Sequence, residues 1–244
     1  MEFGRSLSYP FRDPRWITRV LVGAALEVLP ILTALPLLLV LFRHHGSPRL
    51  GQLPLLGIVA VAGLLCRWIV LGYLARVARD ALAGGGGGLP AWDRFEKDLV
   101  EGLKLWLLTI GLFLPALGVT ASIAFLLAAM GFPAPWLPIL VVLPPLALAT
   151  LFLLPAALVA SVAENELAAA FDLTRVAGVI GAMFGPYVLA FVLAIAIEIV
   201  AQLGLLVLCV GIFATRFLAH CIVVHAFAAV YREGRPQGDA VLAV

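Results

Sequence analysis

The sequence predicts an all-α integral membrane protein, a bundle of six transmembrane helices with both termini in the cytoplasm. Composition is the first reason: 64% of the 244 residues are hydrophobic and 12% are charged, whereas soluble domains carry about 25% charged residues. The second reason is the length of the apolar stretches, because about 20 residues of helix cross a bilayer. The third is the placement of Lys and Arg, which gather in alternate connections.

Six apolar stretches predict one transmembrane domain over residues 17–231. The first stretch follows several arginines, as in a signal peptide, but it exceeds the roughly 7–15 residues of such a core and is expected to be retained. Only Gly204 and Gly211 offer a turn between the last two, so that boundary is soft. The spans are 17–42, 55–78, 103–130, 137–163, 186–208 and 212–231, between an N-terminal segment 1–16 and a tail 232–244.

The basic residues predict the orientation, since Lys and Arg are retained on the cytoplasmic side of a membrane. Arg43 and Arg49 lie on one side, and Arg67 and Arg216 lie within spans. The other side collects Arg5, Arg12, Arg15, Arg19, Arg76, Arg79, Arg94, Lys97, Lys104, Arg175, Arg232 and Arg235. This imbalance predicts that both termini are cytoplasmic.

Two cytoplasmic connections are predicted to form amphipathic helices at the membrane interface. In 93–102, Phe95, Leu99 and Leu103 recur every four residues, as on one face of a helix. A similar apolar stripe runs through 164–184. Trp92, Phe95 and Phe171 are the expected interface anchors, because aromatic rings favour that depth. The acidic residues of the first segment are expected to form a solvated face: Asp93, Glu96, Asp98 and Glu101.

Ionisable residues within the spans are the candidate site, because a charge at the bilayer centre costs at least about 2.5–3.5 kcal/mol. Glu27 and Arg67 reach similar depths, which predicts an ion pair between the first two spans. Residues four apart share a helix face. The spacing in the last two spans therefore predicts contacts of Glu198 with His220 and of Gln202 with Arg216.

This polar cluster has two interpretations. It either binds a small polar or anionic group or relays protons, or it is a set of ion pairs that fixes helix register. The structural interpretation is preferred.

Chemical motifs are missing from the sequence. It contains no Gly-x-Ser-x-Gly and no His-Glu-x-x-His, and the glycine run 84–88 lacks the Gly-Lys-Ser/Thr of a phosphate loop. The three cysteines lie in apolar runs without a Cys-x-x-Cys spacing. We expect no catalytic residue, cofactor, metal or nucleic-acid partner.

Three segments, 72–108, 154–176 and 220–232, carry a resemblance to a known family. The most specific positions are Leu89, Pro90, Trp92 and Asp93, then Ala170, Phe171 and Asp172. With these residues the chain resembles the domain-of-unknown-function family 4013, multi-pass membrane proteins of bacteria and archaea, over nearly its whole length. The resemblance implies six spans with two amphipathic cytoplasmic segments, in a bacterial or archaeal plasma (inner) membrane, and it transfers no catalytic residue. The run 84–88 departs from the more polar, acidic turn of the family.

Three classes of function remain. The preferred one is a non-enzymatic accessory or scaffold subunit of a larger membrane complex, with lipids and other membrane subunits as partners and a homo-oligomer as an alternative. The second is a small-molecule transporter or lipid-handling protein that uses the charges within the spans. The third is an intramembrane enzyme, which would rest on Glu198, Arg216 and His220 alone.

Overall fold

The computed structural model describes residues 3–43, 53–85, 87–206 and 211–234, and all regular structure in these ranges is helical. No strand occurs among them. The elements are α1 (Phe3–Ser8), η1 (Pro10–Arg12), α2 (Trp16–Arg43), α3 (Leu53–Leu82), α4 (Phe95–Ala129), α5 (Leu137–Val141), α6 (Leu143–Glu164), η3 (Leu167–Ala170), α7 (Leu173–Ala182), α8 (Phe184–Gln202), η4 (Leu203–Leu206) and α9 (Gly211–Gly234).

Among the residues that the structure describes, five helices are long and apolar enough to cross a membrane, so this is a multi-pass membrane protein. They are Gly57–Leu82, Phe95–Ala129, Leu137–Glu164, Phe184–Gln202 and Gly211–Gly234. At the position of the first predicted span, α2 is one further helix of 28 residues. The turn between α8 and α9 includes residues 207–210, outside the described ranges.

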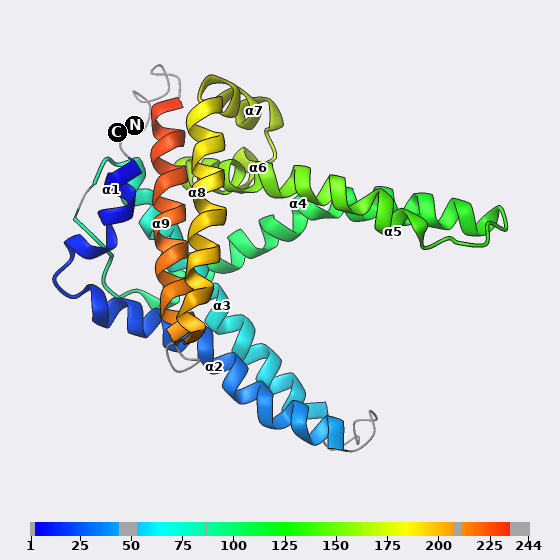
Figure 1. Cartoon of the computed structure of the whole chain (residues 1–244), viewed down its shortest axis with the longest axis horizontal. Coiled ribbons are helices and arrows are strands. Elements are labelled where there is room, and N and C mark those ends of the chain that lie inside the picture. Colours follow the sequence, from blue (N-terminus) through cyan, green and yellow to red (C-terminus); the bar gives the residue numbers. More distant parts are fainter. Residues whose placement is uncertain (1–2, 44–52, 86, 207–210, 235–244) are drawn as a thin grey trace.

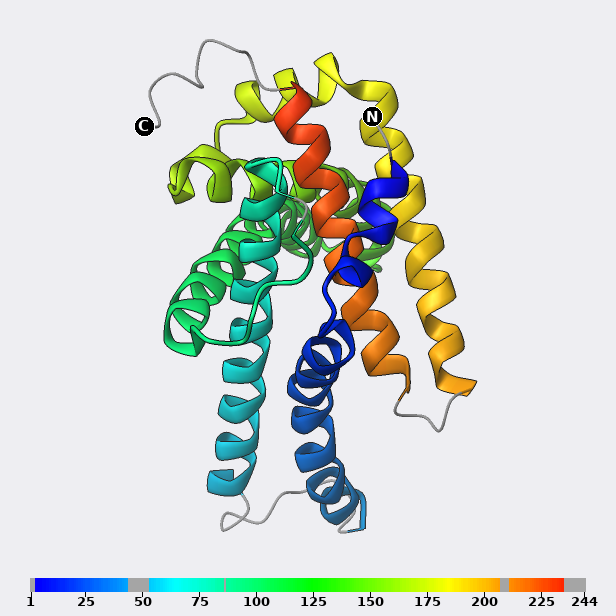
Figure 2. The same ribbon diagram turned by 90° about the vertical axis from the view of Figure 1, so that its left-hand side faces the viewer.

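The long helices form three hairpins that diverge, instead of one parallel bundle. In Figure 1, α2 and α3 run to the lower right, α4 and α6 run to the right, and α8 and α9 stand upright. Figure 2 views α4 and α6 along their length and shows the other two hairpins side by side. The hairpins meet where small residues permit close packing, and beyond that region large apolar side chains of α4 and α6 face outward.

We call this meeting region the hub: residues 70–82 of α3, 95–108 of α4, 156–164 of α6 and 217–231 of α9. One buried cluster joins the end of α3 to α6, α7, α8 and α9. A second joins α3 and α9 to α2 and the N-terminal segment. Half of the apolar window of α9 is buried, the largest share of the five. The hub therefore fixes where the hairpins begin.

Two glycines set the crossing of α3 and α4. A Cβ atom on Gly72 would overlap the carbonyl of Asp98, and one on Gly102 would overlap the carbonyl of Trp68. The two backbones thus touch directly, as small residues allow between membrane helices.

The two predicted interface helices differ from expectation. Residues 95–102 are the first turns of α4, continuous with the span that follows, and pack against α3. Residues 164–184 divide into η3 and α7, where Asp172 caps α7 by accepting from the backbone N–H of Arg175. Val176 and Ile180 are buried in the hub cluster, while Leu173 is exposed. Part of the second apolar stripe thus faces protein, whereas in residues 95–102 the buried residues are Asp98 and Gly102.

The N-terminal segment is part of the core. Ser6 and Tyr9 are buried, and Nδ1 of His225 on α9 lies 3.0 Å from the Ser6 hydroxyl. The Tyr9 ring lies against the His225 ring at a centroid distance of 4.2 Å. The pKa of Tyr9 is raised by burial and by the nearby Asp80 carboxylate. The segment before α2 is therefore held against the last helix.

We expect Gly102→Leu to destabilise the protein by about 1–3 kcal/mol, because overpacking forces two backbones apart. The unfolding temperature in detergent, monitored as the loss of the monodisperse protein on heating, measures the effect. Gly57→Leu is the matched control, since nothing lies within 4 Å of a Cβ atom there. Equal unfolding temperatures for the two variants would contradict the close crossing.

Candidate functional site

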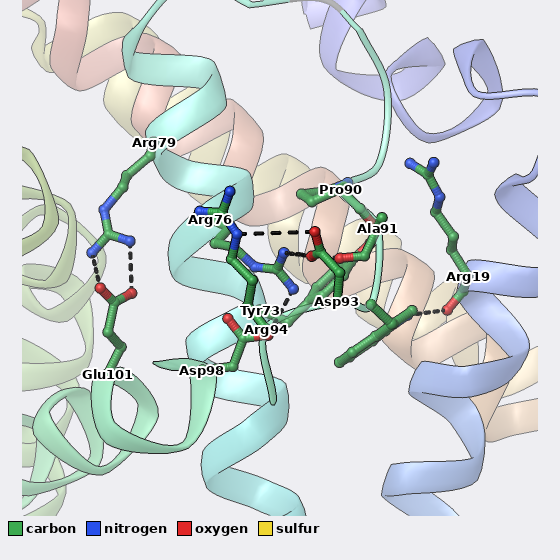
Figure 3. Close-up of polar contacts among 11 residues, drawn as sticks. Arg19, Tyr73, Arg76, Arg79, Pro90, Ala91, Asp93, Arg94, Asp98 and Glu101 are labelled. Atoms are coloured by element: carbon green, nitrogen blue, oxygen red, sulfur yellow. Dashed lines mark hydrogen bonds and ion pairs between the residues drawn. The ribbon is translucent and has the colours of Figure 1, made fainter. Parts of the chain in front are cut away.

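A charged network fastens α3 to α4 and to the connection between them (Figure 3). The guanidinium of Arg76 donates to Asp98 Oδ2 at 2.6 Å, to Asp93 Oδ1 at 2.9 Å and to the Ala91 carbonyl at 2.8 Å. Arg79 donates to both oxygens of Glu101, at 2.6 and 2.7 Å. Two arginines of one helix thus grip the start of the next.

The glycine crossing places these partners. Gly72 and Arg76 are one turn apart on α3, and Asp98 and Gly102 are one turn apart on α4, so the antiparallel helices bring the charges together beside the crossing. The Asp98 side chain is 1% exposed. The expectation that Asp98 belongs to a solvated face is therefore wrong, because α4 continues inward without a break and turns this residue toward α3. Glu101 is 25% exposed. Asp93, 57% exposed, keeps contact with water.

Two carboxyl groups of the network differ in solvation. Desolvation acts to raise the pKa of Asp93, but the hydrogen bond from Arg76 and its positive charge outweigh it, so the pKa lies below the ordinary value. Buried Asp98 has no such access to water and depends on Arg76 for compensation.

Aromatic contacts close the connection over α3. The Trp92 ring stacks on Tyr73 at a centroid distance of 3.9 Å, and its Nε1 donates to the Arg19 carbonyl of α2 at 2.9 Å. The Tyr73 hydroxyl donates to the Pro90 carbonyl at 2.9 Å. Phe95 stacks beside Trp92 and is exposed, as is Phe171. The Trp92 ring thus packs between helices; the role of the three rings as interface anchors stays a prediction.

The network borders a cleft of about 530 Å³. Four basic and four acidic side chains line it: Arg76, Arg79, Arg94 and Lys97, with Asp80, Asp93, Asp98 and Glu101. The shortest contacts join opposite charges. These paired charges hold α3 and α4 together. We call the residues that form the pairs, Arg76 and Arg79 with Asp93, Asp98 and Glu101, the α3–α4 joint.

A second polar cluster lies within the helices. His220 of α9 stands between two carboxylates: its Nδ1 is 3.4 Å from Glu27 Oε1 of α2, and its Nε2 is 3.2 Å from Glu198 Oε1 of α8. The exposed fractions of these side chains are 19% for His220, 9% for Glu27 and 35% for Glu198. The contact of Glu198 with His220 is the one that the spacing predicts.

The other predicted contacts are not formed. Glu27 faces His220 instead of Arg67, because α9 packs against both α2 and α3 and brings its imidazole to the carboxylate. Arg67 and Arg216 line a cavity of about 240 Å³ together with Glu27. Among the described residues, Gln202 donates only within α8, to the Glu198 carbonyl at 3.3 Å. Thr215 joins the helices there by donating to the Ala201 carbonyl at 2.7 Å.

In this cluster one imidazole lies between two carboxylates, an arrangement that differs from a metal centre. The two carboxylates approach opposite nitrogens of one ring, so their oxygens cannot converge on one ion. Within the described ranges no group of three His, Cys, Asp or Glu side chains is placed to hold a metal. Cys66 and Cys221 are buried free thiols, and Cys209 lies outside these ranges.

Residues 55–210 match the model of a family described as proteins of unknown function, DUF4013. The chain belongs to the DUF4013 family. No curated protein and no solved structure matches the chain. The resemblance is thus confirmed, over a narrower range than the expected near-complete length: the DUF4013 match includes the α3–α4 joint, Arg67 and Glu198, and it excludes Glu27, Arg216 and His220.

The α3–α4 joint carries charges that the sequence did not single out. From the sequence, Arg76 and Arg79 predict only the orientation in the membrane, although Asp98 and Gly102 mirror Arg76 and Gly72 on the neighbouring helix. A glycine with an opposite charge one turn away on each of two antiparallel helices is the signal that would have found the joint.

Asp98→Ala is expected to destabilise this DUF4013 protein by about 3–5 kcal/mol, because it leaves the partly buried Arg76 without its buried counter-ion. Thermal unfolding in detergent measures the loss. Asp93→Ala removes the exposed partner of the same guanidinium and is expected to have a much smaller effect. A loss for Asp93→Ala as large as that for Asp98→Ala would contradict the assignment of the buried pair.

His220→Leu is expected to destabilise the protein by about 3–5 kcal/mol, because it leaves the buried Glu27 carboxylate without a partner. Adding Glu27→Gln and Glu198→Gln removes the uncompensated charges and is expected to recover most of the loss. Unfolding temperatures of the single and triple variants make the comparison. If the triple variant is less stable than the single one, the carboxylates do not depend on His220.

Proposed function

We propose that the protein is a non-enzymatic accessory or scaffold subunit of a larger membrane complex. The observation that supports this most strongly is the hairpin of α4 and α6, which leaves the hub and is hardly covered by the chain itself. In the apolar windows of α4 and of Leu137–Glu164, 11% and 6% of the residues are buried. Both helices thus present long faces to their surroundings.

The uncovered face of α4 has a pattern that favours helix association. Gly118 and Ser122 are one turn apart and exposed, and nothing lies within 4 Å of a Cβ atom on Gly118. Large apolar side chains flank them, among them Leu114, Leu117 and Phe125. Small residues at this spacing let a second membrane helix approach closely. The face therefore suits a partner helix.

The joint supplies the rigidity that a scaffold needs. Arg76 and Arg79 hold the base of α4 through four short hydrogen bonds to carboxylates. The exposed hairpin is therefore set in a fixed direction, and a partner seated on it would be positioned relative to the hub.

The proposed orientation has both termini in the cytoplasm of a bacterium or archaeon. α1 packs beside the C-terminal half of α9, and Arg232 of α9 donates to the Ala81 carbonyl at the end of α3. Arg76, Arg79, Arg94 and Lys97 line the cleft of the same hub. Basic residues at the ends of these helices thus gather on one side, which the positive-inside rule assigns to the cytoplasm.

A second candidate function is small-molecule transport or lipid handling. The observation that favours it is the cavity between α2, α3 and α9, which holds charged side chains at a depth where the helices are otherwise apolar.

Purification of the tagged protein in gentle detergent, with mass spectrometry of what stays bound, tests the scaffold role. We expect stoichiometric recovery of other membrane subunits with the wild type and with Gly57→Leu, whose substitution also meets open space. Gly118→Leu is expected to reduce that recovery by about tenfold or more, because a bulky side chain holds a partner helix away. Recovery of the chain alone, or only with copies of itself, would contradict the proposal.

A further inference from the structure

Three helices border an open cavity of about 240 Å³, which we call the three-helix cavity. Its charged walls are Glu27 of α2, Arg67 of α3 and Arg216 of α9, and its apolar walls include Leu26, Val70 and Phe213. Arg216 lies five residues from Gly211, or about 8 Å along the axis of α9 at 1.5 Å per residue. The cavity therefore lies at the edge of the hub, toward the N-terminal end of α9.

The two arginines of this cavity do not form ion pairs with the carboxylates of the polar cluster. In the part of the chain that the structure describes, neither Arg67 nor Arg216 has a carboxylate within ion-pair distance. The nearby carboxylates of Glu27 and Glu198 instead face His220. A guanidinium among apolar helices normally finds an anionic or carbonyl partner, so these two present unused donors to the cavity.

The charges facing the cavity and its neighbouring cluster do not cancel. A protonated imidazole has an N–H on each nitrogen and can face two carboxylates, whereas a neutral ring turns a lone pair toward one of them. In its protonated form, His220 would place one positive charge between the two carboxylates. With Glu27 and Glu198 negative and His220, Arg67 and Arg216 positive, one positive charge remains. A ligand with one negative charge would neutralise it.

We propose that the three-helix cavity binds a phosphate group through Arg67 and Arg216. A carboxylate offers one edge to a guanidinium fork, whereas a phosphate offers oxygen atoms in several directions and can accept from two arginines on different helices. The cavity is smaller than the roughly 300–1,000 Å³ of drug-sized pockets, so it takes a headgroup and not a large molecule. A phosphodiester with one negative charge matches the residual charge.

The ligand can come from the membrane or from solution. The apolar walls Leu26, Val70 and Phe213 suit the hydrocarbon of an anionic phospholipid beside its phosphate, while free inorganic phosphate offers the same contacts to the arginines. The inference is independent of the scaffold role, because it rests on residues outside the exposed hairpin.

Thermal unfolding of the purified full chain, with added short-chain phosphatidylglycerol, short-chain phosphatidylcholine or inorganic phosphate, tests the site. We expect the anionic lipid to raise the unfolding temperature in a saturable manner and the zwitterionic lipid to do so much less. Stabilisation by inorganic phosphate as strong as that by the anionic lipid assigns the site to the free anion. No saturable shift with either anionic probe overturns the proposal.

Arg67→Gln and Arg216→Gln are each expected to weaken apparent binding by about tenfold or more, because truncating one member of a charge-assisted contact is costly. Arg94→Gln, on the exposed side of the joint, is the matched control and retains binding. Leu26→Trp fills the cavity without removing a charge and is expected to abolish binding, which decides the matter if an arginine variant does not fold. Full binding by Leu26→Trp or by both arginine variants overturns the proposal.

Discussion

Direct backbone contact between α3 and α4 at Gly72 and Gly102 is the constraint on which the rest of the arrangement depends. It brings Arg76 within reach of Asp98, and the ion pair then orients the first turns of α4. With both ends of the connection fixed, Trp92 can stack on Tyr73 and donate to α2. A side chain at either glycine would separate the helices and remove each of these contacts in turn.

Charged side chains are paired at the α3–α4 joint but only partly paired around the three-helix cavity. At the joint, opposite charges meet in short contacts, as buried charges require. Beside the three-helix cavity, Glu27 and Glu198 face an imidazole. Arg67 and Arg216 line the cavity and have no ion-pair partner among the described residues. The first arrangement fixes structure, and the second is suited to a ligand.

The helices could be predicted from the sequence, because runs of apolar residues with the length of a bilayer crossing have few alternatives. Details that depend on which helices touch could not. The predicted interface helix does not end at Gly102, because no cap or turn residue interrupts α4 there. Asp98 looked solvated because its partner lies 22 residues away on another helix. Glu198 and His220 could be paired from spacing, since consecutive hairpin helices are antiparallel, whereas the approach of α9 to α2, which gives Glu27 its partner, joins the two ends of the chain.

The N-terminal segment is packed against α9, which the ribosome makes much later. Ser6 meets His225, 219 residues later in the chain, and Tyr9 belongs to the same buried cluster as Phe217 and Cys221. Each hairpin can enter the membrane as it is synthesised, but this cluster cannot close until α9 has been made. Such long-range contacts slow folding, so the segment that holds Ser6 and Tyr9 remains unpacked while the intervening helices are made. During that time it is accessible to targeting factors or proteases.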